Sequence, residues 1–384
     1  MPVAAYTDQM DPVEGAVGIM LESGSEGPFQ LISVAPAEPV TTVDNAAGLF
    51  EGLASRCAEL NLKPIIERVF APPEVLPALR EARREALELF GLPVTGEPSW
   101  VCNPLPSGSL LDSIQVLGVR LEHDWSWRRL EATASCSGTL VQSPELEIIS
   151  LSDLCGSLGR PPKSALRDMF SASEEALRQH GFLYSDVART WFYIADLFDW
   201  YAPFNETRDE LFARTGIEQG SCPPASSCVQ GLHAAGAPCH MELLALKSTA
   251  SERPFRPLRP LRQCEPWQYG STFSRGMVLD FSGQHLVTVS ATASIGPQGE
   301  SRHTGDAKAQ ILDTFASVEH LLSQEGLSLE SAVWQTLYFS DQACYAAWQE
   351  LEKSVSIPEL NGPKLLADTP RRELLFAMEA SILY

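Results

Sequence analysis

The early part of the chain alternates between helix-like and strand-like patterns of apolar and polar positions. Apolar residues recur every three or four positions in Asn45–Leu60 and Pro72–Leu92, which predicts amphipathic helices. Prolines open the second of these stretches and Gly91 closes it, as is typical of helix ends. From Trp100 to Leu121 the pattern changes to strand-like runs separated by Asn-Pro and Ser-Gly turns. This mixture of elements predicts an α+β fold.

A repeat is the most informative feature of the pattern. The stretches that start at Asp168 and at Asp313 share identical residues at matching positions. In each, an amphipathic helix ends at a glycine, a strand follows, and a second helix leads to a closing apolar strand. The closing strands each contain a glutamate, Glu242 in the earlier copy and Glu379 in the later one. The pattern therefore predicts two tandem copies of one sheet-and-helix unit.

The repeat sets the expected domain boundaries. We assign residues 1–250 to a first unit with an N-terminal extension before Trp100, 251–264 to a linker, and 265–384 to a second unit. Proline recurs at every third position of the linker, which favours polyproline II and places its arginines along one edge. Two roles remain open for it: a basic docking strip, or a stiff spacer whose arginines pair with acidic residues of the flanking units.

Composition narrows the possible functions. The chain has 384 residues, 44% hydrophobic and 20% charged, without the long apolar run that a membrane span needs, so we expect a cytoplasmic protein. A net charge of −21 would repel phosphate backbones and disfavours a nucleic-acid partner. The nine cysteines are scattered, and the spacing of Cys222, Cys228, Cys239 and His240 favours a structural role over a metal site. We expect no metal and no cofactor.

The order of elements in each copy resembles the RidA/YjgF family, and the later copy is similar to the chorismatases, which take pyruvate off chorismate. The residues that carry the likeness are YGSTFSRG (Tyr269–Gly276), SATASIGPQGESRHTGD (Ser290–Asp306), Gln310 and Glu379. The resemblance implies one principal pocket, lined by the second unit and bordered by the first. It also implies either a monomer with an internal, oligomer-like interface or a homo-oligomer such as a trimer. Ala291 departs from the family, which has glycine there.

Chorismate is a dicarboxylate with an enol ether, and its hydrolysis needs a proton donor and cations for the carboxylates. Given the resemblance, Glu379 is the candidate acid, because burial in an apolar strand raises a carboxyl pKa. Arg275 and Arg189 are candidate carboxylate clamps, since a guanidinium grips a carboxylate through two hydrogen bonds. A structural ion pair remains the alternative for Arg189. Tyr269 either donates a hydrogen bond to the substrate or packs.

The stretch after the apolar run supplies further candidates. Ser290 and Thr292 alternate along a strand and would offer hydroxyls to a ligand. His303 either contacts the ligand or has a structural role, and Asp306 is expected to cap the helix that starts near Ala307.

Three functions follow from these residues. The first is an enzyme that hydrolyses the enol ether of chorismate or a similar small cyclic carboxylic acid, with release of pyruvate. The second is an enamine/imine deaminase of the RidA type. The third is a non-catalytic protein that binds a small acid. The expected partner in each case is a small anionic molecule.

Overall fold

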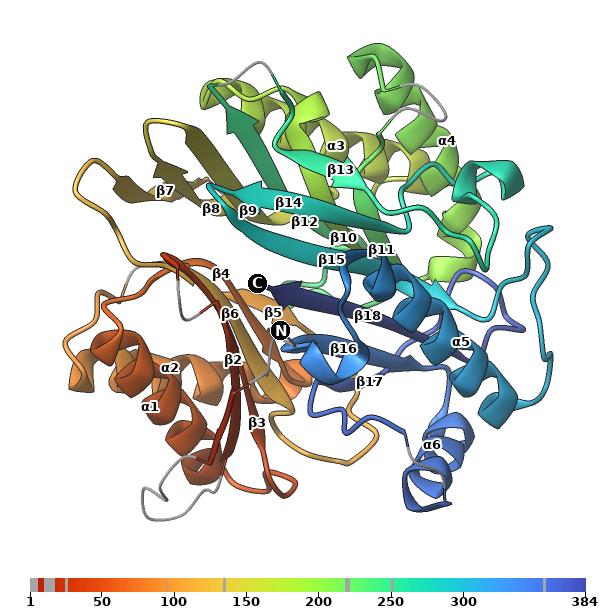
Figure 1. Ribbon diagram of the computed structural model, residues 1–384, viewed down its shortest axis with the longest axis horizontal. Coiled ribbons are helices and arrows are strands. Elements are labelled where there is room, and N and C mark those ends of the chain that lie inside the picture. The colour runs from red at the N-terminus through yellow and green to blue at the C-terminus, as the bar shows by residue number, and fades with distance from the viewer. Residues whose placement is uncertain are drawn as a thin grey trace.

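A computed structural model describes residues 6–9, 18–24, 27–94, 96–133, 136–217, 222–249, 252–354 and 357–384. The described residues form three six-stranded sheets, each with its own pair of helices, and we call each sheet with its helices a unit (Figure 1).

The elements follow one another in the same order in every unit. The first unit contains β1 (Tyr6–Gln9), β2 (Gly18–Ser23), β3 (Phe29–Pro36), α1 (Val43–Glu59), β4 (Lys63–Phe70), α2 (Leu76–Leu89), β5 (Ser99–Val101) and β6 (Ser113–Val119). The second contains β7 (Ser126–Thr133), β8 (Cys136–Gln142), β9 (Leu146–Cys155), α3 (Pro162–Gln179), β10 (Val187–Ile194), α4 (Leu197–Thr215), β11 (Ala225–Gln230) and β12 (Cys239–Ser248). The third contains β13 (Phe255–Pro257), β14 (Gly276–Phe281), β15 (Gln284–Ala293), α5 (Ala307–Leu322), β16 (Trp334–Phe339), α6 (Gln342–Ser354), β17 (Lys364–Leu366) and β18 (Phe376–Leu383).

The sheets also share one strand order. In the first unit it is β1-β2-β3-β6-β4-β5, and the other sheets repeat it as β7-β8-β9-β12-β10-β11 and β13-β14-β15-β18-β16-β17. The last pair is parallel in each sheet, because a helix connects its strands, and the other pairs are antiparallel. The closing strand of each unit therefore lies in the middle of its sheet.

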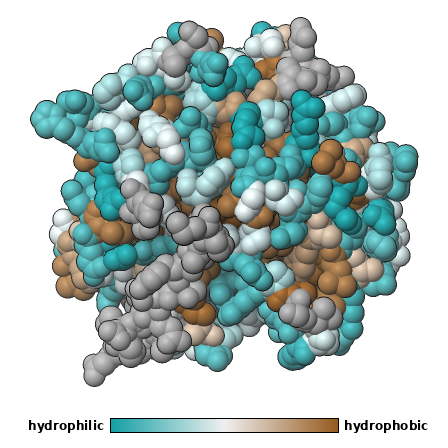
Figure 2. All heavy atoms as spheres, in the orientation of Figure 1, coloured by the Kyte–Doolittle hydropathy of each residue, from teal (hydrophilic) through white to brown (hydrophobic). Residues whose placement is uncertain are grey.

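The hydrophobic core has two levels. Within each unit, one face of the sheet packs against its helices. The opposite faces of all the sheets pack together in a central core that draws residues from every unit, such as Phe29, Trp191 and Phe281. Figure 1 shows the result, with helices on the outside and sheets around the centre. On the face shown in Figure 2, hydrophilic residues dominate and apolar groups lie scattered between them.

The α+β class is confirmed. The tandem arrangement has three units instead of the two expected, so the two copies predicted from the sequence correspond to the second and third units, and the expected boundaries need correction. The stretch before Trp100, expected to extend the first unit, builds most of a separate sheet of the same strand order. A break between units lies between Val119 and Ser126 instead. The expected linker is also wrong in part, because Phe255–Pro257 pairs with β14 as the edge strand of the third sheet. Among the described helices, none is long and apolar enough to cross a membrane.

Candidate small-molecule site

A pocket lies where the second and third units meet. The second unit contributes Tyr201, Asn205 and Arg208, whose spacing places them on one face of α4. The third unit contributes Tyr269 and Arg275 from the segment that leads into β14, as well as side chains from β15 and β18. A parallel bridge between Ala225 and Ser274 holds the two walls together.

Unpaired cations dominate the pocket. Arg208, Arg275 and Arg371 line it, and the described lining residues include no carboxylate. Arg208 and Arg275 are almost fully buried, and the Nε of each has no hydrogen-bond partner. The only hydrogen bonds found for these two guanidinium groups within the described chain go to Asn205 Oδ1 (2.7 Å) and to the Cys264 carbonyl oxygen (3.5 Å). A buried charge without a partner is costly, so the arrangement favours a bound anion.

Tyr269 packs between two of these cations. It ends a short helical turn, and the next residue, Gly270, adopts a left-handed conformation (φ 85°) that residues with a side chain rarely adopt. The guanidinium carbons of Arg275 and Arg371 lie 5.5 and 4.7 Å from the centre of its ring. Burial raises the pKa of the Tyr269 hydroxyl, which keeps it protonated and able to donate a hydrogen bond. The structure thus brings the predicted residues Arg275 and Tyr269 together.

Glu379 lies behind the pocket wall rather than in its lining. Its carboxylate pairs with Arg189 Nη2 at 2.7 Å and with Arg68 Nη1 at 3.2 Å, and Ser227 donates a further hydrogen bond. Arg68 Nε also lies 3.4 Å from Glu242 Oε2. We call Arg68, Arg189, Glu242 and Glu379 the central ion cluster. It joins all the units.

The expected raised pKa of Glu379 is therefore wrong. Burial does act to raise it, but the guanidinium groups of Arg189 and Arg68 hold the pKa below its ordinary value. Arg189 forms a structural ion pair, which was the alternative to a carboxylate clamp, because it pairs with Glu379 and does not line the pocket. The pocket and the carboxylate are nevertheless close in the fold. Ala291 lines the pocket, and its backbone N–H donates to Ser227, which in turn holds Glu379.

The other predicted residues lie outside the pocket lining. Ser290 accepts a hydrogen bond from the Ser226 N–H (2.8 Å) and donates to the Ser274 carbonyl (2.6 Å). Thr292 donates to the Ser290 carbonyl (2.9 Å). Strict alternation misled the prediction here, because the pairing register of β15 with β18 shifts between Val289 and Thr292. These hydroxyls fix the backbone of the wall instead of facing a ligand.

His303 lies in an exposed turn at a positive φ of 53°. Its carbonyl accepts a hydrogen bond from Gln310 Nε2 (3.3 Å), so the residue has a structural contact and no place in the pocket lining. Asp306 caps α5 as expected, accepting from the Ala309 N–H at 3.0 Å.

Four residues of the pocket were not predicted from the sequence: Arg208, Asn205, Tyr201 and Arg371. The first three had a signal in their helical spacing, but nothing in the sequence shows which face of α4 meets the other unit. Arg371 belongs to the segment before the last strand, where no pattern of apolar positions fixes the direction of a side chain.

A separate group of possible metal ligands lies at the junction of the first and second units. Asp153, Cys155 and His233 approach within 4.8 Å of one another. However, His233 Nδ1 accepts hydrogen bonds from the N–H groups of Ala235 (3.2 Å) and Ala237 (3.4 Å), so Nε2 carries the proton and donates to Asp153 Oδ1 at 2.5 Å. Metal-binding histidines normally donate from their second nitrogen, and this wiring therefore disfavours a metal.

Comparison with solved structures identifies the fold. The crystal structure of a chorismatase matches the chain with a TM-score of 0.54 at 17% identity, over 70% of this chain and 82% of that one. The chain has a chorismatase-like fold. Yeast Mmf1 (14% identity, TM-score 0.28) aligns over 34% of this chain and 98% of its own. The E. coli YjgF gene product (16% identity, TM-score 0.26) aligns over 33% of this chain and 98% of its own. No protein-family model matches the chain, and no curated protein matches it by sequence.

Each of the shorter structures thus covers about a third of the chorismatase-like chain. The resemblance to the chorismatases, inferred from the sequence, is confirmed for the fold.

Proposed function

We propose that the protein binds chorismate or a similar small cyclic carboxylic acid in the pocket between the second and third units, and hydrolyses its enol ether with release of pyruvate. The observation that carries the proposal is the set of buried guanidinium groups that lack carboxylate partners, at Arg208 and Arg275. Their free N–H groups match the two oxygens of a carboxylate, and the half-buried Arg371 provides a further charge in the lining.

The proposed reaction is a hydrolysis. A proton adds to the terminal CH₂ carbon of the enol ether and leaves an oxocarbenium ion, which water attacks. The resulting hemiketal loses the ring alcohol and becomes pyruvate, so one water molecule is consumed and no oxidant or metal is required. The binding site must hold the carboxylates, and a proton donor must reach the CH₂ carbon.

Glu379 is poorly suited to donate that proton in the arrangement described above. Two guanidinium groups favour its ionised form, and its carboxylate lies outside the pocket lining. This observation favours a second candidate function, in which the protein binds a small dicarboxylate without converting it. The two candidates share the pocket and differ only in turnover.

One experiment tests both candidates. Chorismate is added to the full chain, binding is measured by calorimetry, and pyruvate is measured by a coupled lactate dehydrogenase assay. Binding with pyruvate release supports the hydrolase, and binding alone supports the second candidate. If chorismate does not bind, it is not the ligand of either candidate, and a parallel assay of imine hydrolysis then tests the RidA-type activity.

The arginines allow a matched comparison. Arg275→Met and Arg371→Met should each weaken chorismate binding, by roughly 2–5 kcal/mol for the buried Arg275 and less for the partly exposed Arg371. Arg372→Met is the control, because Arg372 is an exposed neighbour that stacks on Phe198 outside the pocket. Equal losses in Arg371→Met and Arg372→Met would show that the general surface charge, and not the pocket, attracts the ligand.

A further inference from the structure

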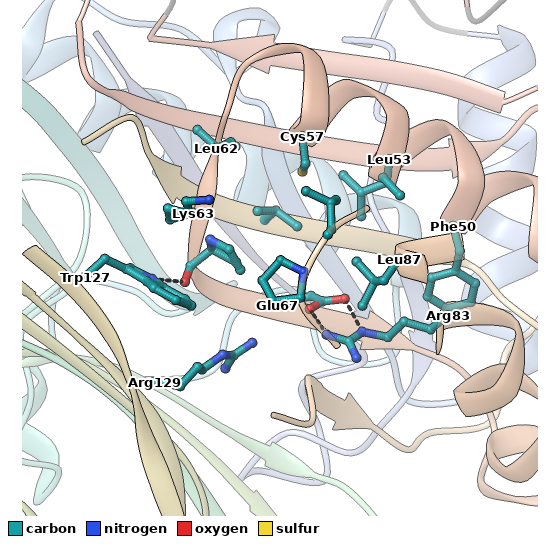
Figure 3. Close-up of a pocket in the computed structure, with 15 residues that line it drawn as sticks. Phe50, Leu53, Cys57, Leu62, Lys63, Glu67, Arg83, Leu87, Trp127 and Arg129 are labelled. Atoms are coloured by element: carbon teal, nitrogen blue, oxygen red, sulfur yellow. Dashed lines mark hydrogen bonds and ion pairs between the residues drawn. The ribbon is translucent and has the colours of Figure 1, made fainter. Parts of the chain in front are cut away.

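A second cavity lies within the first unit and has no lining residue in common with the pocket described above. It lies between α1, α2 and β4, with β7 of the second unit along one side (Figure 3). Most of its lining is apolar and includes Phe50, Leu53, Ala54, Leu62, Leu87, Leu92 and the ring of Trp127.

One carboxylate lines this cavity, among the described residues, and its charge is already compensated. Glu67 accepts hydrogen bonds from Arg83 at 2.7 and 2.6 Å, and both side chains are only 8% exposed. Figure 3 shows the pair across the cavity from Arg129. Burial acts to raise the pKa of Glu67, but Arg83 and, more weakly, Arg129 keep it below its ordinary value. The pair therefore remains ionised and contributes no net charge.

Arg129 has neither a hydrogen-bond partner nor a close ion pair within the described chain. Strand alternation on β7 turns Trp127 and Arg129 toward the cavity and Arg128 away from it. Within the described chain, Arg129 forms no ion pair closer than 4 Å and no hydrogen bond, and its Nε is buried. Lys63 at the edge of the cavity adds charge of the same sign. An apolar chamber with a net positive charge at one side favours a ligand of complementary character.

We propose that this cavity binds a small amphipathic monocarboxylate, with its carboxylate on Arg129 and its hydrocarbon body between α1, α2 and β4. Arg83 is already neutralised by Glu67, which leaves Arg129 as the guanidinium available to a ligand, so the ligand carries one carboxylate and not two. The site is independent of chorismate and of the pocket between the second and third units.

The test uses octanoate as the probe and calorimetry on the full chain. Wild-type protein should bind octanoate, and Arg129→Met should weaken binding about ten- to a hundredfold, the usual effect of losing a charge-assisted hydrogen bond. Arg128→Met is the matched control, because it removes the same charge from the adjacent, outward-facing position and should leave octanoate affinity unchanged. Octylamine, with the same chain and the opposite charge, should not bind.

A second variant guards against misfolding of the first. Ala54→Phe fills the cavity from α1 without a change of charge and should also abolish octanoate binding. Arg371→Met, in the other pocket, should retain it. The proposal is overturned if wild-type protein does not bind octanoate, if Arg129→Met binds it as wild type does, or if octylamine binds equally well.

Discussion

The two glutamates of the closing strands show how neighbouring residues of one type acquire different chemistry. Glu379 meets two guanidinium groups, at Arg189 and Arg68, and its pKa is lowered. Glu242 is also buried but, among the described residues, forms an ion pair only with Arg68, at 3.4 Å, and burial raises its pKa, with the nearby Glu379 acting in the same direction. The number of cations within reach therefore decides the sign of the shift.

Glu379→Gln should destabilise the protein strongly. The substitution leaves Arg189 and Arg68 buried without their main counter-charge, and breaking a buried pair in this way costs about 3–5 kcal/mol. Urea unfolding measures the loss. Glu373→Gln, at an exposed position on the same segment, should change the unfolding free energy little. A variant at Glu379 as stable as wild type would show that the central ion cluster is not a structural requirement.

His240 should make stability depend on pH. Burial, together with His233, lowers the pKa of His240 to about 3, whereas an unfolded histidine titrates near 6.5. The unfolded chain therefore binds the proton more tightly, and the contribution of His240 is complete above about pH 6.5 and is lost as pH falls toward 3. Between pH 7 and 5 the loss amounts to about 2 kcal/mol.

The measurement is the unfolding free energy at several pH values. His240→Asn should reduce the slope between pH 6.5 and 5 by about 1 kcal/mol per pH unit, because asparagine does not titrate. His123→Asn is the control, since the His123 side chain is 98% exposed. An unchanged slope in His240→Asn would assign the acid sensitivity to other groups.

At the scale of single helices and strands, several predictions from the sequence agree with the structure. The predicted helix Asn45–Leu60 agrees with α1, and the helix expected from Pro72 begins as α2 only at Leu76, because its prolines form a short helical turn first. In the expected linker, Arg256 pairs with Glu325 at 2.6 Å and Arg262 with Asp313 at 3.3 Å. The expected pairing of the arginines with acidic residues is thus confirmed for these two, although Arg256 lies in β13 and not in a spacer.

The helix cap at Asp306 provides a test at the same scale. Asp306→Ala removes the hydrogen bond to the Ala309 N–H and should cost about 1 kcal/mol of stability. Asp306→Asn keeps an oxygen acceptor and should lose at most a few tenths of that. Thermal unfolding of both variants, compared with wild type, gives the two values. Similar losses in both would mean that the carboxylate charge, and not the hydrogen bond, stabilises the helix.

The first unit was not recognised as a copy of the repeat, because its closing strand lacks the features that the closing strands of the other two units share. β6 carries Gln115 instead of a glutamate and pairs with β3 without a register shift. In contrast, the pairing of the Glu242 strand with β9 and of the Glu379 strand with β15 each includes a register shift. The shared strand order depends on apolar patterning, which many sequences satisfy, so only identical residues reveal a repeat. The pocket was only partly predictable from the sequence. Arg275 and Tyr269 lie in a recognisable motif, whereas Arg208 comes from another unit, so the motif indicates only the first two.

At the scale of the molecule, the units are joined by buried hydrogen bonds that cross from one to another. Asn103 of the first unit donates to the carbonyl of Gln230 in the second (3.0 Å) and of Leu366 in the third (3.1 Å). Trp334 of the third unit donates to the Ile32 carbonyl of the first (2.8 Å). The interfaces therefore resemble the interior of one domain rather than contacts between separate ones.

We expect the protein to be a monomer of 42.0 kDa, because the three units already occupy each other's inner faces. Sedimentation velocity over a range of concentrations measures the mass. A species of three times that mass would support the trimeric alternative and would require a further interface on the outer surface.

The central ion cluster also has a consequence for symmetry. Its first unit contributes one positive charge (Arg68), its second unit one of each sign (Arg189 and Glu242), and its third unit one negative charge (Glu379). A ring of identical subunits cannot make this combination, since it would repeat each charge in every subunit. If the third unit of one chain replaced the first unit of another, three carboxylates (Glu242 and two copies of Glu379) would share the centre with only Arg189 to balance them. The uneven charges thus oppose exchange of units between chains, and they favour assembly of each chain with itself.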